Sequence, residues 1–379
     1  MFQLNDTTEL IRSVGNALID NYSQGQPVVG GINGPYDDPE TNIRNLSHLA
    51  VICGIEIIKF QKTELIPVLK RIGNDILAEQ GNNGLWVMRR KATKDTCNGV
   101  IGHAWLIEGL LYIYKVLRDE IYITKAMEVA RQHGFEPGVG LWERPTGEGI
   151  DYTLNHQLWY AASLAELNEY VKVESFENQI YRFLECLTKN FSINKMGRIR
   201  HNTIMHRKKI DTIKQLIKNY NYDCNEKHYK PSMAYKEEGY HSFNLMALTR
   251  LYRIKGSDNF FSTNGFSSSI QYLKTDHFFD GLNSNRVDLD ISLNNSITDC
   301  NEKSINIYGY PYNVPGFELP YISTVFPELH LNAVMEECLM NQVNYTYDPK
   351  VCLFGKDCHD KQTINYRVYE YYRFLEIEK

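Results

Sequence analysis

The chain has 379 residues, of which 43% are hydrophobic, 23% charged and 12% aromatic, a composition typical of a folded globular protein and not of a disordered one. Its 41 Lys and Arg against 46 Asp and Glu give a net charge of −5 without a basic stripe, which excludes a nucleic-acid partner held by phosphate contacts. The eight scattered cysteines favour reduced thiols, and without a signal-like N-terminus or a run of about 18 apolar residues we expect a cytoplasmic protein with no membrane span.

Apolar residues at helical spacing dominate the sequence, and alternating strand patterns are few, so the chain is predicted to be all-α. Gly, Pro, Asn and Asp separate the helical segments. In chain order, the predicted helices cover residues 45–60, 64–80, 98–117, 120–134, 155–170, 175–191, 241–254 and 365–377.

A short motif repeats at a spacing that indicates helical hairpins. Gly84-Leu85-Trp86 recurs 56 residues later as Gly140-Leu141-Trp142, and 57 residues after that in degenerate form as Gly197-Arg198-Ile199. Six units of about 55 residues would nearly fill the chain, which predicts one (α/α)6 barrel over residues 1–379 with short extended loops at one rim. An open superhelix of the tetratricopeptide or HEAT kind is disfavoured because its units span only about 34 to 47 residues.

One predicted helix of each pair begins with polar or ring-bearing residues. In a toroid the inner helices direct one set of ends toward a common funnel, so these side chains would meet there. A single residue of this kind is more often a helix cap or a buried core histidine, but the recurrence favours a shared saccharide-binding cavity. The expected contacts include His103, Trp105, Asn155, Trp159, Tyr240 and Asn244.

Asp151 is the first candidate for a catalytic carboxylate. It ends a Gly-rich loop and precedes a helix that carries Asn155, His156 and Trp159 near one face. Desolvation beside an aromatic wall would raise the pKa of Asp151, as a general acid requires. A plain helix-capping role remains equally open.

Three further carboxylates and a group of arginines complete the candidates. Asp95 and Glu238 also precede predicted inner helices, although Glu238 could be a solvated first-turn residue, and Glu318 lies in a Pro-bounded turn. Arginines that follow the repeated motifs could bind the carboxylate of a uronate-like sugar, or could form rim salt bridges. The expected rim contacts are Trp86, Trp142, Arg144 and Arg200.

No metal or cofactor is expected. Neither residues 201–206 nor residues 352–359 have the second pair of ligands that a zinc site needs. The glycines within residues 28–34 lack the lysine and the following helix of a phosphate-binding loop.

Two segments carry a resemblance to known proteins. Asn98-Gly99-Val100-Ile101-Gly102-His103-Ala104-Trp105-Leu106-Ile107-Glu108-Gly109-Leu110 and Asp151-Tyr152-Thr153-Leu154-Asn155-His156-Gln157-Leu158-Trp159 resemble the six-hairpin glycosidase superfamily, which includes unsaturated uronyl hydrolases. More narrowly, they are similar to the agl cluster protein family, found beside glycan-assembly genes. The likeness is best over residues 80–255. It implies an (α/α)6 barrel, a carbohydrate substrate and an acid/base aspartate at Asp151, with Asp95 the nearest match to a second one.

The sequence therefore favours a glycoside hydrolase acting on an oligosaccharide or polysaccharide that contains uronic acid. Asp151 would act as general acid, and Asp95, Glu238 or Glu318 as base or nucleophile. If Asp151 acts alone, hydration of an unsaturated uronic acid becomes the better interpretation. An epimerase or lyase with His103, His156 or His241 as bases is the first alternative. A helical-repeat scaffold for glycan assembly, without chemistry, is the second.

Overall fold

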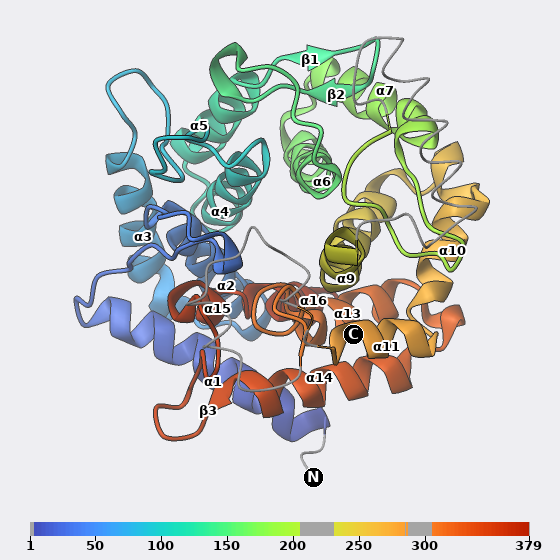
Figure 1. Cartoon of the computed structure of the whole chain (residues 1–379). Coiled ribbons are helices and arrows are strands. Elements are labelled where there is room, and N and C mark those ends of the chain that lie inside the picture. The colour runs from blue at the N-terminus through green and yellow to red at the C-terminus, as the bar shows by residue number, and fades with distance from the viewer. Residues whose placement is uncertain (1–3, 205–230, 285, 287–304, 379) are drawn as a thin grey trace.

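The computed structural model describes residues 4–204, 231–284, 286 and 305–378. In this part of the chain, six helices form a closed inner ring in which each packs against the next and the last packs against the first (Figure 1). The chain is thus an (α/α)6 toroid, as the repeat spacing predicts. The inner helices are α2 (Ile43–Phe60), α4 (Ile101–Leu117), α6 (Leu154–Val171), α9 (Pro231–Lys255), α13 (Pro315–Val325) and α16 (Tyr369–Ile377).

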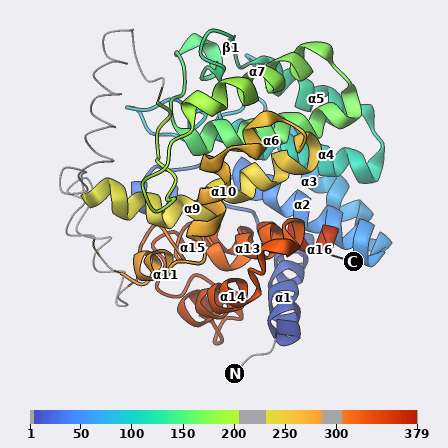
Figure 2. The same cartoon turned by 90° about the vertical axis from the view of Figure 1, so that its right-hand side faces the viewer.

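A second layer of helices surrounds the ring. Among them α3 packs on α2, α5 on α4, α7 on α6, α11 on α9 and α14 on α13, while α1 contacts α2 and lies beside α14 at one edge of the molecule (Figure 2). The outer helices are α1 (Leu4–Ser23), α3 (Ile66–Ala78), α5 (Glu120–Arg131), α7 (Glu174–Asn190), α10 (Asn264–Tyr272), α11 (Asp276–Leu282) and α14 (Asn332–Thr346).

Short elements connect these helices. Two antiparallel ribbons are present, β1 (Phe135–Glu136) with β2 (Leu141–Trp142) and β3 (Tyr347–Asp348) with β4 (Leu353–Phe354). They agree with the short extended loops expected at the rim. The remaining helical segments are η1 (Gly34–Tyr36), η2 (Thr63–Leu65), η3 (Pro145–Gly147), η5 (Asn259–Ser262), η7 (Pro327–Leu329) and α15 (Lys361–Tyr366).

The hydrophobic pattern explains which helices lie inside. Every residue of α4 from Ile101 to Ile113 is buried, because this helix is covered on all sides by its neighbours. In α7, by contrast, the buried positions Phe176, Ile180, Phe183 and Leu187 follow the spacing of one helical face. A helix that is apolar all round belongs in the inner ring, and an amphipathic helix belongs in the outer layer.

Buried ion pairs join the inner helices across the ring. Arg250 on α9 pairs with Glu108 on α4 and with Glu166 on α6, and Arg373 on α16 also pairs with Glu166. Burial alone would raise the pKa of Glu166, but the two guanidiniums outweigh it and lower that pKa. These contacts fill the ring's interior with charged groups and hold four inner helices together.

The sequence pattern predicted most of the described helices, but the structure differs from the prediction in three places. Helix α9 begins at Pro231, ten residues before the predicted start. The predicted segment 365–377 is divided between α15 and α16. Glu318, expected in a Pro-bounded turn, lies inside α13, because Pro315 occupies the first helical turn where proline is tolerated.

Two global expectations can be compared with the described residues. Six of the eight cysteines are described and all six are free thiols, whereas Cys224 and Cys300 lie outside the described part. Within the described ranges, no helix has the length and apolar character needed to cross a bilayer.

Candidate functional site

A cavity lies at the N-terminal ends of the inner helices. It contains about 570 Å³ of space, part of it open to solvent, and all six inner-helix segments contribute lining residues. This agrees with the expectation that the helix ends share a funnel. The contributions from the successive segments include Arg44, Trp105, His156, Tyr240, Asn313 and Arg367.

An outer groove continues from this cavity toward the surface. It contains about 770 Å³ and shares Arg89, Lys94, Asn98, Thr153 and His156 with the cavity. The residues that line the groove but not the cavity include Asp95, Arg144, Glu148 and Asp151.

Asp151 and His156 form a hydrogen-bonded pair at the junction of cavity and groove. His156 Nδ1 lies 2.7 Å from Asp151 Oδ2. The Asp151 side chain is 1% exposed and that of His156 18%, so a bound molecule can reach the imidazole while the carboxylate stays behind it. Because a carboxylate only accepts, Nδ1 carries the hydrogen of this contact, which leaves Nε2 as the other ring nitrogen.

Backbone donors fix the carboxylate from two directions. The Val100 N–H donates to Asp151 Oδ2 at 3.0 Å, and the Thr153 N–H donates to Oδ1 at 3.1 Å. Burial alone would raise the pKa of Asp151, but His156 and these N–H groups outweigh it and lower the pKa. The expected rise was therefore wrong, because hydrogen bonds to the charged form exceed the desolvation cost. Asp151 is an ionised partner of His156 and not a neutral acid.

A tight turn brings the start of α4 onto this pair. Asn98 and Gly99 both have positive φ, 62° and 67°. A Cβ on Gly99 would lie 1.9 Å from Asp151 Oδ2 and 2.4 Å from His156 Nδ1. Glycine is therefore required here, both for the left-handed backbone and for the close approach.

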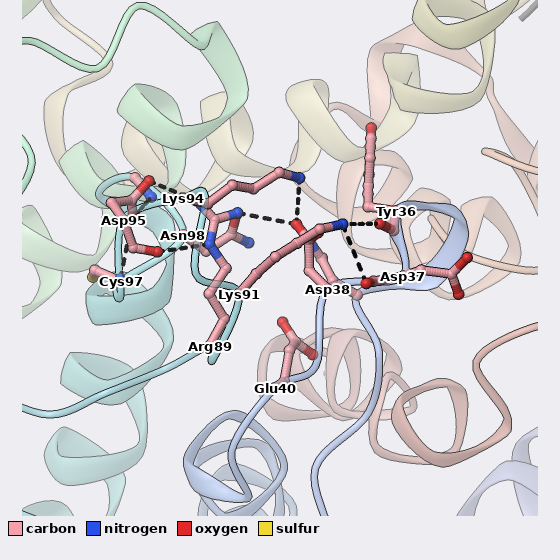
Figure 3. Close-up of polar contacts among 12 residues, drawn as sticks. Tyr36, Asp37, Asp38, Glu40, Arg89, Lys91, Lys94, Asp95, Cys97 and Asn98 are labelled. Atoms are coloured by element: carbon pink, nitrogen blue, oxygen red, sulfur yellow. Dashed lines mark hydrogen bonds and ion pairs between the residues drawn. The ribbon is translucent and has the colours of Figure 1, made fainter. Parts of the chain in front are cut away.

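Asp38 is the centre of a cluster of cations at the cavity wall (Figure 3). Lys91 and Lys94 each lie 2.6 Å from one of its carboxylate oxygens, and Arg89 lies 3.2 Å away. Burial raises the pKa of Asp38, but these three cations outweigh it, and the pKa is lowered. One carboxylate thus faces three positive charges, one of which, Arg89, is also paired with Asp95.

Asp95 closes the other side of the same cluster. Its Oδ2 lies 2.6 Å from Arg89 Nη2 and 3.7 Å from Arg144 Nε. Its Oδ1 accepts from the N–H groups of Cys97 and Gly99. The side chain is therefore engaged on both oxygens, and its position in the groove supports the Gly99 turn.

Two guanidiniums form another part of the cavity lining. Arg44 is paired with Glu40 at 3.1 Å and stacks on Trp105, with its Cζ 3.9 Å from the ring centroid. Arg367 lies 3.1 Å from Glu318 and 2.6 Å from Glu370. Glu318 is thus a buried partner of Arg367 and does not line the cavity.

Tyrosines and a second histidine form the wall beside Lys236. The Tyr36 and Tyr240 hydroxyls are 2.8 Å apart, and the ammonium of Lys236 lies 4.8 Å from the Tyr36 ring centroid. His201 also lines the cavity and packs edge-on against Tyr240. Burial, followed by the nearby Lys236 charge, lowers the pKa of His201 well below its usual value, so the ring is neutral.

Two predicted histidine bases lie outside the cavity. His241 Nε2 donates to the Ser269 carbonyl at 2.8 Å, and its Nδ1 accepts from the Ile199 N–H at 3.2 Å. His103 contacts His133 and the Trp86 carbonyl. Both side chains are fully buried, and they connect neighbouring segments away from the cavity.

Several other predicted residues also lie away from the cavity. Glu238 pairs with Arg198, and Arg200 pairs with Glu237. Trp86 and Trp142 are buried and donate to groups of the outer helices α3 and α7. Trp159 and Asn244 are buried within the inner ring.

The cavity contains residues that the sequence analysis missed. Asp38 and Tyr36 lie in the loop before α2, and Lys94 lies in the loop before α4. The sequence did contain a signal for these residues. They lie in segments that precede inner helices, and such segments form the end of the toroid that contains the cavity. Among the predicted contacts, Trp105, Asn155 and Tyr240 do line the cavity.

The fold and this geometry can be compared with known proteins. No protein-family model matches the chain. Over 398 aligned positions it is 28% identical to archaeal glycosylation protein Q of Haloferax volcanii, and the alignment covers 99% of both chains. The chain is thus a homologue of that protein along its whole length.

Two solved structures share the fold at low sequence identity. Cellobiose 2-epimerase from Bacillus thermoamylovorans superposes with a TM-score of 0.55 at 10% identity, over 90% of each chain. A novel α-amylase from Clostridium perfringens gives a TM-score of 0.55 at 13% identity, over 97% of this chain and 98% of its own. The six-hairpin resemblance is therefore confirmed at the level of fold.

Proposed function

We propose that the protein is a carbohydrate-active enzyme of glycan assembly that transfers protons at an acidic sugar through His156. The single observation that carries this proposal is the pairing of His156 with a buried, ionised Asp151 at the junction of cavity and groove. The similarity to archaeal glycosylation protein Q supports a role in glycosylation, and the shared fold of cellobiose 2-epimerase and an α-amylase supports a saccharide substrate.

The pair is suited to proton transfer. Asp151 holds the ring so that Nε2 can take a proton, and the carboxylate then stabilises the imidazolium that forms. The Tyr36 hydroxyl, the Trp105 face and the Asn155 amide are typical of a surface that contacts sugar rings and hydroxyls.

The cations of the cavity favour an acidic sugar. Among the described residues that line the cavity, Asp38 is the acidic one, and the basic ones are Arg44, Arg89, Lys94, Lys236 and Arg367. A uronate carboxylate placed among them would acidify the hydrogen on the adjacent carbon. When Nε2 removes that hydrogen, the electron pair moves onto the carboxylate, where fixed cations stabilise the added charge. Return of a proton gives epimerisation, and loss of a neighbouring substituent gives elimination.

Hydrolysis is the second candidate, because three carboxylates, Asp95, Glu148 and Asp151, line the groove. A glycosidase needs one proton donor and one base or nucleophile flanking the bond. Since Asp151 is ionised, the donor in such a reaction would be the His156 imidazolium. Net cleavage of a glycosidic bond would select this candidate.

Binding and turnover with matched sugars test the proposal. We expect uronic disaccharides to bind at least about 10-fold more tightly than their neutral counterparts, and Lys236→Met to reduce that preference. His156→Gln should bind with little change but lose at least about 100-fold in turnover. Equal affinity for both sugars would contradict the acidic substrate, and normal turnover by His156→Gln would contradict the assignment of the base. A scaffold would bind a saccharide without converting it.

A further inference from the structure

Three potential metal ligands converge behind the start of α4, outside the cavity and the groove. Cys97 lies in the loop before α4, His103 in its first turn, and His133 directly after α5. Their exposed fractions are 0%, 0% and 4%. The Cys97 sulfur and one ring nitrogen of each histidine lie within 4.8 Å of one another.

The outward nitrogens of both histidines are already oriented. His133 Nδ1 lies 2.8 Å from the Glu143 carbonyl oxygen, and His103 Nε2 lies 3.3 Å from the Trp86 carbonyl oxygen. The inward nitrogens, His103 Nδ1 and His133 Nε2, face each other at 2.8 Å. A ring that donates one N–H to a backbone carbonyl and directs its other nitrogen inward is typical of a metal-bound histidine.

The pair of His103 and His133 has one hydrogen fewer than its contacts require. Carbonyl oxygens only accept, so both outward nitrogens need a hydrogen, and the contact between the rings needs a third. Two neutral imidazoles supply two hydrogens. The three contacts therefore need one hydrogen more than the two neutral rings supply. A cation between the inward nitrogens would replace it and leave both carbonyl contacts intact.

We propose that Cys97, His103 and His133 bind a zinc ion. One thiolate and two imidazoles are donors that Zn²⁺ prefers, with Zn–N of about 2.0 to 2.1 Å, so the inward nitrogens would need to separate from 2.8 Å to about 3.3 Å. Zinc binds the thiolate form of cysteine, so binding would release the Cys97 proton to solvent. The three residues supply three of the usual four ligands, and water would complete the set.

The site would support the catalytic pair without contacting substrate. Cys97 lies between Asp95, which lines the groove, and Gly99, whose turn packs against Asp151 and His156. A metal at Cys97 would tie this turn to the end of α5 through His133. The proposal does not depend on which reaction the cavity performs.

Metal content and cobalt absorption test the proposal on the full-length chain. After equilibration with Zn²⁺ and removal of excess, we expect one zinc per chain, with a Kd of about 1 μM or tighter. Co²⁺ in its place should give sulfur-to-cobalt charge-transfer absorption. Cys97→Ser should abolish that band and weaken zinc binding at least about 100-fold, since metal affinity depends on the thiolate.

Cys53→Ser is the matched control, because Cys53 is equally buried but lies on α2, where its sulfur is 3.9 Å from the Leu65 carbonyl oxygen. It should keep both the zinc and the cobalt band. If Cys97→Ser fails to fold, the cobalt spectrum of the unaltered chain still decides the question. A chain without stoichiometric zinc, a cobalt complex without sulfur ligation, or undiminished binding by Cys97→Ser would overturn the site and leave a neutral histidine pair.

Discussion

Asp151→Asn should separate the charge of this side chain from its shape. The carboxylate accepts three hydrogen bonds, from His156 Nδ1, the Val100 N–H and the Thr153 N–H. An amide has one oxygen, so its NH₂ group must face at least one of these donors. With the amide oxygen toward Val100, the Thr153 N–H loses its acceptor. With the NH₂ group toward Val100 and His156 instead, the Val100 N–H is unpaired, and His156 must move its proton from Nδ1 to Nε2.

Either orientation leaves a backbone donor unpaired beside a buried side chain, which costs about 1 to 3 kcal/mol of stability. Catalysis should suffer more. The imidazolium loses its counter-charge, and in one orientation Nε2 no longer carries a lone pair, so turnover should fall about 10²- to 10⁴-fold.

Three measurements check this prediction: denaturant unfolding, turnover, and ¹⁵N NMR of the His156 ring. Asp119→Asn is the control. Asp119 accepts from the Ile121 N–H at the exposed start of α5 and lines neither the cavity nor the groove. It should lose no turnover. If Asp151→Asn keeps turnover within about threefold of the unaltered protein, the role of Asp151 as the partner of a catalytic base is refuted.

Three further substitutions test the supporting structure. Gly99→Ala places a Cβ 1.9 Å from Asp151 Oδ2 at φ +67°, so we expect about 2 kcal/mol or more of destabilisation and a large loss of turnover, measured by unfolding and rate assays. Burial lowers the pKa of His241 to about 3, below its unfolded value, so stability is lost as pH falls from about 6.5, by about 2 kcal/mol at pH 5. Unfolding of His241→Gln across this range should show a shallower pH dependence, and an equal slope would contradict it. Arg250→Met leaves the Glu108 carboxylate buried without its guanidinium and should cost about 3 to 5 kcal/mol in denaturant unfolding, whereas an unchanged midpoint would show that the pair is not structural.

The fold was accessible from the sequence because it repeats. Gly84 and Gly140 occupy equivalent loops after α3 and α5, so their spacing reports the hairpin length directly. The later hairpins have no such marker. Helix α13 carries Pro315 and Pro320, which indicate a turn in isolation, and only packing on α14 and α16 makes the segment helical.

The sequence predicted the site only where a contact joins residues that are close to each other along the chain. Asp151 and His156 are five residues apart, so their contact depends on one loop and one helical turn. His241 also lies on an inner helix, but its orientation on that helix directs both ring nitrogens to backbone groups. The sequence pattern gives no information on such an orientation. Likewise, the approach of Asp38 to Lys94 joins residues 56 apart and follows from the packing of α2 on α4.

The sign of the Asp151 pKa shift could not be predicted from the sequence for the same reason. Burial was foreseeable from the apolar surroundings of the helix. The donation by the Val100 N–H, however, comes from a loop 51 residues earlier and depends on the left-handed turn before α4. Such long-range backbone donors, and not composition, decide whether a buried carboxylate is neutral or charged.

Hydrogen exchange at the sugar tests the central claim most directly. A uronic saccharide that binds the protein should be incubated in ²H₂O with the unaltered protein or with His156→Gln, and analysed by NMR and mass spectrometry. The account predicts that solvent deuterium enters at the carbon next to the carboxylate with the unaltered protein, and that His156→Gln slows this at least about 100-fold. Conversion of the sugar without any deuterium at that carbon, or equal incorporation with both proteins, would contradict it.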